Sequence, residues 1–328
     1  MESNKRVQIV MGTANFGDPT SFWGQSDSNL LEAFDLLKKH GHNKLDCAQA
    51  YNGSESKLGA LEAGITHGFL IDTKWRGGWA REKDANSTAG IVSAAKASLD
   101  RLKVPQVDIF YLHAPVYNTP IEETLAGVNA AYRAGNFRRF GVSNFPPEDV
   151  QQVYNVCKEK NYVLPTVYQG NYSAIARSSE ERLLPLLRKL SIAFLAYSPI
   201  AGGFLTKDRA QIGSGETRFS PNQMYGLYHK MYVKDVLLDG LEDWERIATD
   251  EGISKAELAY RWVVYSSSLS AEEGDGIVIG ASRLAQLEET LLFCDKGPLS
   301  QKAVEGINEL WQKVKHEAPV DNYQSAKQ

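Results

Sequence analysis

The fold of this chain is decided by the stretch Val7-Gln8-Ile9-Val10-Met11-Gly12-Thr13-Ala14-Asn15-Phe16-Gly17. Its first half, Val7–Met11, is apolar and rich in β-branched residues, which predicts a buried strand. An open, doubly wound sheet that binds a dinucleotide carries the pattern GxGxxG in the turn after such a strand. The turn here, Gly12–Gly17, has Ala14 where the middle glycine belongs, so the stretch disfavours that fold.

Outward from this stretch, the same unit of a short strand followed by a longer helix recurs along the chain. Further strands are predicted at Lys44–Cys47, Phe69–Lys74, Val107–His113, Arg139–Ser143, Thr166–Gln169, Ala193–Tyr197 and Ile277–Gly280. Helical periodicity is found at Ser28–His40, Ser54–Ala63, Thr88–Leu102, Thr119–Ala134, Pro147–Lys160, Glu180–Leu190, Lys255–Tyr265 and Leu284–Leu292. Eight alternating units favour an α/β fold of the (β/α)8, or TIM-barrel, type over an open sheet.

The chain is longer than a simple barrel needs, because it has 328 residues and such barrels typically have about 250. We assign the extra length to long βα loops, Lys207–Asn222 and Ser266–Gly276, and to an additional C-terminal helix, Gln301–His316. We therefore predict one barrel domain over residues 1–328, with the C-terminal helix and tail at about 300–328. The polar tail Glu317–Gln328 is predicted to be loosely held.

Composition and charge exclude several classes of protein. Hydrophobic residues make up 43% of the chain and charged residues 23%, which is typical of a globular domain. The net charge of −4 argues against a nucleic-acid partner, since such proteins are usually basic. The longest apolar stretch, Ile192–Leu205, is too short and too often interrupted to span a membrane. Three scattered cysteines suit a reducing compartment and predict a cytoplasmic protein, and without a Cys/His cluster no metal site is expected.

Reactive residues of a barrel lie just after the C-terminal ends of its strands. Here three neighbouring strand ends supply Asp46, Tyr51, Lys74 and His113. Each has an ordinary structural explanation alone, but together they form a chemically consistent set. A lysine ammonium lowers the pKa of a nearby phenol, a carboxylate keeps the lysine charged, and a neutral imidazole can orient a carbonyl oxygen. The set predicts a proton donor for an oxyanion, as carbonyl reduction requires.

Later strand ends carry groups that suit a nicotinamide cofactor. Ser143, Asn144 and Gln169 could hold a carboxamide, and Tyr197 offers a flat ring for stacking. The last strand leads into a helix start with Arg283, where backbone N–H groups and a guanidinium can bind phosphate. The alternative is that these are ordinary polar residues and that Arg283 is a solvated surface charge.

At this point the sequence resembles the aldo-keto reductases. Asp46, Tyr51, Lys74 and His113 match the family's catalytic tetrad in identity, order and approximate spacing. Further segments resemble its cofactor-binding motifs, namely Gly141–Phe145, Ala196–Gly203, Ile279–Arg283 and Gln286–Thr290. The segments Gln106–Pro115 and Leu164–Gly170 look closest to the aflatoxin-aldehyde reductase branch. The resemblance covers nearly the whole chain.

The resemblance implies NADPH-dependent reduction of an aldehyde or ketone, with Tyr51 as general acid, Lys74 and Asp46 as its tuning pair and His113 orienting the carbonyl. Arg283, with Ser282, is the candidate for the 2′-phosphate, whereas Gln286 stands where many members have a second basic residue, which weakens the preference for NADPH over NADH. The implied cofactor-binding residues are Ser143, Asn144, Gln169, Tyr197, Ser198, Pro199, Ile200, Gly202, Gly280, Ser282, Arg283, Gln286, Glu289 and Thr290.

The substrate is predicted only as a small-molecule carbonyl compound. The aflatoxin-aldehyde branch typically ends in an arginine suited to a substrate carboxylate, but this chain has no arginine after Arg283, so an acidic semialdehyde is disfavoured. Arg218 could serve an anion instead, or lie in solvent. The aromatic residues that follow strands one and three could line an apolar pocket, or simply pack at the rim; they are Phe22, Trp23, Trp75 and Trp79.

Two alternatives to a reductase remain at this point. The family includes potassium-channel β-subunits, so a cofactor-binding regulatory subunit is the second hypothesis. A lyase or isomerase that uses the same tyrosine and lysine without net redox change is the third. Because related reductases include dimers, a homodimer is also considered.

Overall fold

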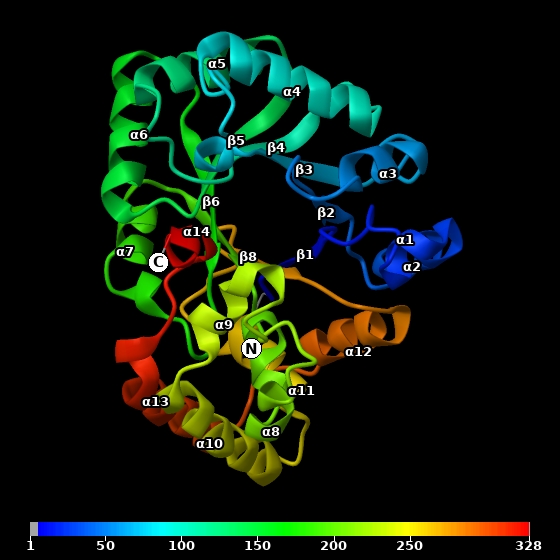
Figure 1. Cartoon of the computed structure of the whole chain (residues 1–328), viewed down its shortest axis with the longest axis vertical. Helices are drawn as coiled ribbons and strands as arrows, with labels where there is room; N and C mark the ends of the chain where they lie inside the picture. The colour runs from blue at the N-terminus through cyan, green and yellow to red at the C-terminus, as the bar shows by residue number, and fades with distance from the viewer. Residues whose placement is uncertain (1–5, 328) are drawn as a thin grey trace.

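The computed structural model describes residues 6–327 and contains a closed barrel of eight parallel strands, which confirms the predicted (β/α)8 class (Figure 1). Each strand pairs with the next in sequence, and β8 pairs with β1. The strands are β1 Gln8–Gly12, β2 Lys44–Asp46, β3 Leu70–Trp75, β4 Val107–Leu112, β5 Phe137–Ser143, β6 Pro165–Asn171, β7 Ala193–Tyr197 and β8 Gly276–Ile279. All eight predicted strands are present, with shifts of a few residues at their ends.

The barrel closes where β1 meets β8, with Ile9 beside Ile277 and Val10 beside Val278. All eight pairings are parallel, so the carboxyl ends of all the strands lie at one mouth. The strand-to-helix loops therefore converge there.

The helices predicted from periodicity are present around the sheet. They are α2 Asp27–Lys39, α3 Ser54–Ala60, α4 Thr88–Leu102, α5 Ile121–Arg133, α6 Pro147–Glu159, α7 Leu183–Lys189, α11 Lys255–Tyr265, α12 Leu284–Asp295 and α13 Gln301–Val314. None of the helices in the described residues is long and apolar enough to cross a membrane.

One long helix lies outside the prediction, α10 Asp235–Glu251. It buries one face, which includes Leu241 and Trp244, and it lies alongside α13 (Figure 1). The spacing of its apolar residues is regular, but the prediction assigned one helix to each strand and therefore included no helix at Asp235–Glu251. The two helices form a second layer on one side of the barrel.

The segment predicted as a long loop after β7, Lys207–Asn222, is partly helical. It contains α8 Arg209–Gly213, whose start is stabilised by a capping box between Asp208 and Gln211. The helix α9 Leu227–Tyr232 follows further along the chain. The short helix α1 Phe22–Gln25, between β1 and α2, was also not predicted.

The prediction of a loosely held C-terminal tail is wrong for the residues up to Lys327. The helix α14 Asn322–Lys327 lies against α9 (Figure 1). Tyr323 is only 5% exposed, and its ring meets that of Trp79 edge-on at 4.7 Å between centroids. The sequence of the tail is polar on average, but its aromatic side chain is buried among residues from distant loops, which composition alone does not reveal.

The interior of the barrel is only partly apolar. One layer of buried side chains, including Val10, Ile109 and Leu195, forms its own hydrophobic cluster inside the strands. A larger cluster lies between the strands and the surrounding helices. Strands β2 and β3 add charged side chains that are almost completely buried, namely Lys44, Asp46, Asp72 and Lys74. Because charges are costly to bury, this side of the barrel is the first place to look for function.

Candidate active site

The centre of the site is the ammonium of Lys74 on β3. Its Nζ lies 2.6 Å from Asp46 Oδ2 and donates hydrogen bonds to Asp46 and to the backbone oxygen of Cys47 at 2.8 Å. Lys74 is fully buried and Asp46 is 1% exposed. Burial alone would lower the pKa of Lys74, but Asp46 outweighs it and the pKa is raised. The lysine therefore stays protonated and its charge is fixed in place.

Tyr51 reaches this ammonium from the turn that follows β2. The backbone continues the pairing of β2 with β3 beyond the strand, since Cys47 N donates to Asp72 O and Gln49 N to Lys74 O. A tight turn then brings the phenol over the lysine, and Lys74 Nζ donates to Tyr51 Oη at 3.4 Å. The sequence thus places both residues at one point although 23 positions separate them.

The phenol of Tyr51 has a pKa of about 12, above its usual 10, because burial outweighs the lowering effect of Lys74. The expected net decrease of the pKa is therefore wrong. The reason is that the lysine is itself neutralised by Asp46, while the phenol has lost much of its contact with water. Tyr51 is consequently protonated at neutral pH and can act as a donor.

His113 completes the group at the end of β4. Its ring lies edge-on to that of Tyr51, with centroids 5.9 Å apart. Burial lowers its pKa to about 3, and the Lys74 charge contributes in the same direction. The imidazole is neutral at ordinary pH, as predicted, and its Nδ1 has no hydrogen-bond partner among the described residues.

The residues predicted to hold a carboxamide are brought together beside this group. Asn144 Nδ2 donates to His113 O at 2.9 Å, and Asn144 Oδ1 accepts from Tyr197 Oη at 2.7 Å. Asn144 adopts a φ of 63°, a left-handed conformation that asparagine tolerates better than most residues. Gln169 Nε2 donates to Asp46 Oδ1 at 2.8 Å, so this set is connected to the lysine pair. Ser143 belongs to the same group of residues, because its Oγ accepts a hydrogen bond from Asn144 Nδ2 at 3.2 Å.

The loop after β7 has a backbone suited to anions. Ser198, Ala201, Gly202 and Gly203 all have positive φ values, and such runs turn successive N–H groups toward one side. A Cβ on Gly202 would lie 2.2 Å from the Tyr228 ring, so this position admits only glycine. The predicted residues Pro199 and Ile200 belong to the same loop.

A cavity of about 260 Å³ continues from this loop toward the start of α12. Predicted cofactor residues in its lining are Ile200, Ser282, Arg283, Gln286, Glu289 and Thr290. Thr206, Ala256, Tyr260 and Phe293 also line it and were not predicted. They belong to η3 Ala201–Thr206, α11 and α12, where no motif distinguishes them from packing residues. Gly280 directly follows β8, before the residues of the cavity wall, and is exposed.

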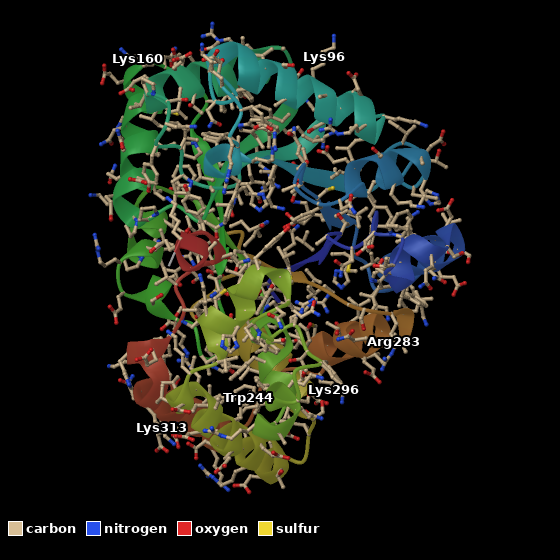
Figure 2. All side chains as sticks on the ribbon, viewed as in Figure 1. Lys96, Lys160, Trp244, Arg283, Lys296 and Lys313 are labelled. Atoms are coloured by element: carbon tan, nitrogen blue, oxygen red, sulfur yellow. The ribbon has the colours of Figure 1, made fainter. Side chains whose placement is uncertain are left out.

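At the edge of this cavity, Arg283 lies at the start of α12 (Figure 2). It is exposed, and among residues 6–327 it forms no ion pair. Gln286 Oε1 accepts from both the backbone N and the Oγ of Ser282, at 2.7 and 2.8 Å. Gln286 thus supports the turn of Ser282 and leaves Arg283 as the cation at this end of the cavity.

The predicted substrate-pocket residues are distributed over different environments. Trp23 is 1% exposed and donates to Ala281 O, and Trp75 is 7% exposed and donates to Asn86 Oδ1. This burial is more typical of side chains that pack in the core than of side chains that line a substrate pocket. Phe22 and Trp79 are partly exposed. Arg218 is exposed and lies over the Tyr228 ring, 5.0 Å from its centroid.

Sequence reasoning missed Asn322 of α14, whose backbone N donates to Tyr197 Oη at 3.1 Å. The signal was absent because the contact uses main chain and comes from the opposite end of the sequence. No group of three or more His, Cys, Asp or Glu side chains in residues 6–327 is arranged to hold a metal ion.

Comparison with known proteins identifies the family of this chain. The model of the Aldo/keto reductase family matches residues 8–312. The chain is 38% identical to the oxidoreductase sirO of Leptosphaeria maculans, over 95% of each chain. It is also 38% identical to aflatoxin B1 aldehyde reductase member 2 of Rattus norvegicus, over 96% of this chain and 87% of the relative. The human protein of the same name is 34% identical over 96% of this chain and 89% of its own length. The chain belongs to the aldo/keto reductase family, and its relatives include the aflatoxin-aldehyde reductases to which the sequence was compared above.

Proposed function

We propose that this protein catalyses the NADPH-dependent reduction of an aldehyde or ketone to an alcohol, with Tyr51 as the proton donor. The observation that carries the proposal is the enclosed Lys74 ammonium, which donates to Asp46, to a backbone oxygen and to the phenol of Tyr51. A permanent positive charge directly behind a neutral phenol stabilises the negative charge that develops when its proton is passed on.

The reaction requires one hydride at the carbonyl carbon and one proton at the carbonyl oxygen. When a cofactor is bound, its reduced nicotinamide supplies the hydride. The oxygen then becomes an alkoxide, which is a stronger base than a phenolate even when the pKa of the phenol is about 12. Tyr51 Oη gives up its proton to this oxygen, and the neutral imidazole of His113 orients the oxygen by a hydrogen bond.

The residues present fit a nicotinamide dinucleotide. Asn144, Ser143 and Gln169 offer amide and hydroxyl groups beside His113 and Asp46, and the ring of Tyr197 is anchored next to them. The loop after β7 supplies backbone N–H groups for a diphosphate. The cavity that ends at Arg283 would hold the adenosine part, and the guanidinium would bind a 2′-phosphate.

For the substrate we propose a neutral, largely apolar aldehyde or ketone. Phe22 and Trp79 are the partly exposed aromatic residues that follow β1 and β3. The names of several relatives refer to an aldehyde, aflatoxin B1 aldehyde. Since the chain has no arginine after Arg283, a dedicated partner for a substrate carboxylate is not expected at its end.

The test is the variant Tyr51→Phe, assayed for NADPH oxidation with a panel of aromatic and aliphatic aldehydes. Loss of the proton donor is expected to reduce turnover by a factor of about 100 to 10,000. Binding of NADPH, followed by quenching of tryptophan fluorescence, is expected to change little. Full activity of the variant would contradict the assignment of the acid.

The same assay on the unmodified protein separates the other readings. Cofactor binding without oxidation by any carbonyl compound would favour a regulatory subunit. Conversion of a substrate in the absence of nicotinamide would favour a lyase or isomerase.

We also propose a cytoplasmic location, because the three cysteines are free and buried and such thiols persist in a reducing compartment. The homodimer stays a prediction, which sedimentation analysis tests.

A further inference from the structure

A second buried carboxylate lies directly beneath the catalytic lysine. Asp72 precedes Lys74 by two residues on β3, so both side chains leave the same face of the strand. Its Cα is paired in register with that of Asp46 on β2, which places the two carboxylates on neighbouring strands at the same level. Asp72 is 0% exposed. The proposed chemistry uses Asp46 and Lys74, but has so far given Asp72 no role.

Asp72 lacks the contacts that normally hold a buried carboxylate. Neither of its oxygens has a hydrogen-bond partner within residues 6–327. The nearest cation is Lys44, whose Nζ lies 3.9 Å from Asp72 Oδ2 but only 2.9 Å from Asp108 Oδ2. Asp108 in turn accepts hydrogen bonds from Nε and Nη2 of Arg139, at 3.2 and 2.7 Å. The cations below Asp72 are thus largely committed to another carboxylate.

The groups that face Asp72 come from each neighbouring strand. Lys44 and Asp46 come from β2, Asp108 and Tyr111 from β4, and Arg139 from β5. Lys74 follows Asp72 by two residues on the same face of β3. Tyr111 is fully buried inside the barrel and its Oη has no partner either. Arg139 is bonded to Asp108, and Lys74 already has three acceptors. An ionised Asp72 is therefore poorly compensated at this position.

Protonation of Asp72 follows from this environment. Burial raises its pKa, Lys44 lowers it, and the charges of Asp108 and Asp46 raise it again, with a result of about 7. Asp72 is then the group of this interior that changes charge near neutral pH, because Tyr51 has a pKa of about 12 and His113 one of about 3.

We propose that Asp72 is a positioning residue whose charge sets the electrostatic potential at Lys74 and Tyr51, so that the uncharged carboxyl favours carbonyl reduction and the carboxylate opposes it. This inference rests on the proposed reductase function. A negative charge on Asp72, next to Asp46, partly cancels the positive electrostatic potential of Lys74. It thereby disfavours the oxyanion that forms at the substrate. The rate of reduction accordingly falls as Asp72 loses its proton.

The experiment measures kcat/KM for aldehyde reduction from pH 5.5 to 9 in the unmodified protein and in Asp72→Asn. The unmodified protein is expected to lose activity as the pH rises through about 7. Asp72→Asn, which is always uncharged, is expected to match it within about twofold at pH 6 and to exceed it about three- to tenfold at pH 8.5. An unchanged pH profile in Asp72→Asn, or an equal loss of activity at every pH, overturns the proposal.

Two further variants keep the result interpretable. Lys44→Met removes the cation that lowers the pKa of Asp72 and is expected to move the inflection to higher pH. Asp275→Asn is the matched control, since Asp275 is also a buried carboxylate (1% exposed), but it is bonded to Arg188 and Phe194 N on the far wall of the barrel. That variant is expected to lose stability and to keep the pH profile of the unmodified protein.

A readout without turnover separates this proposal from the reductase assignment. A carboxyl whose pKa is raised on folding binds more protons in the folded than in the unfolded state between the unfolded pKa of 3.8 and about 7. Its contribution to stability is full below that window and is lost as the pH rises through it. Asp72→Asn should remove this loss of stability with rising pH, as measured by urea unfolding.

If no carbonyl compound is reduced but the unfolding result holds, the reductase assignment fails and the protonation of Asp72 stands. If this loss persists in Asp72→Asn, the proton is not on Asp72 and the proposal is wrong.

Discussion

The phenol of Tyr51 is subject to two opposing influences that decide its protonation state. Burial raises its pKa to about 12 although Lys74 lowers it. For reduction this is sufficient, because the alkoxide product is the stronger base. For the reverse reaction the phenol would first have to lose its proton, so alcohol oxidation is expected only at alkaline pH. If Tyr51 is the proton donor proposed above, the reductive direction is therefore expected to dominate near neutrality, and initial rates of aldehyde reduction and alcohol oxidation measured across pH would test this.

The side chain of Arg283 is expected to decide the preference for NADPH over NADH. Arg283 is an exposed guanidinium at the cavity edge with no ion-pair partner in the described chain, so it is free to bind a 2′-phosphate bidentately. Arg283→Ala is expected to raise the Kd for NADPH about tenfold or more and to leave that for NADH within about twofold. Fluorescence titration with both cofactors measures the difference. Equal weakening of both cofactors would instead indicate a general effect on the loop.

The individual residues of the site differ in how far the sequence predicts them. Asp46, Lys74 and His113 lie at or just beyond the ends of neighbouring strands, so a barrel brings them together once the strands are known. In the sequence, Asp72 cannot be distinguished from other strand residues. Its exceptional feature is that its carboxyl oxygens have no hydrogen-bond partner among the described residues. Partners are a property of the packed interior, and no spacing along the chain reports them.

At the scale of elements, the C-terminal helix α14 acts as a wall of the mouth. Asn322 N donates to Tyr197 Oη, and Tyr323 Oη donates to Pro115 O at 3.3 Å. These contacts connect the end of the described chain with the loop after β4 and with the last residue of β7. A helix of six residues is marginal alone, so its position depends on these contacts.

Removal of one side chain tests this wall. Tyr323→Ala leaves a cavity beside Trp79 and is expected to reduce the free energy of unfolding by about 2–4 kcal/mol. KM for apolar aldehydes is expected to rise more than kcat falls, because Trp79 loses its support while Tyr51 and Lys74 keep theirs. Urea unfolding and steady-state kinetics measure both quantities. Leu292→Ala, at an exposed position of α12 (47% exposed), is the control for loss of apolar volume at the surface. An unchanged KM would show that the wall does not shape the substrate pocket.

The elements could be predicted where the period is clear and the order of strand and helix is regular. All eight strands fall into this class, as do α2 to α7 and α11 to α13. The helix α10 is equally regular, but it packs on α13 and not on a strand, so a scheme with one helix per strand omits it. For α14 the polar tail sequence is uninformative, since its burial is created by the loops that it meets.

For the whole molecule, the neutral His113 makes stability depend on pH. Its pKa is lowered from 6.5 to about 3 on folding, so the unfolded chain binds the proton more tightly. The resulting stability is full above pH 6.5 and is lost as the pH falls toward the folded pKa. His113→Asn is expected to lose about 2 kcal/mol less than the unmodified protein between pH 7 and pH 5. Urea unfolding at both values measures this difference. Identical losses would show that His113 is charged in the folded protein.

The junction of β1 with β8 has a consequence for how the molecule assembles. Ile9 and Ile277 must find each other across almost the whole chain, and folding slows as native contacts become more distant in sequence. Until β8 is inserted, β1 and β7 each present an unpaired edge, which is a template for association with other chains. The slowest and most aggregation-prone stage of folding is therefore expected to be the insertion of this last strand. Recovery of refolded protein should accordingly fall as the protein concentration rises.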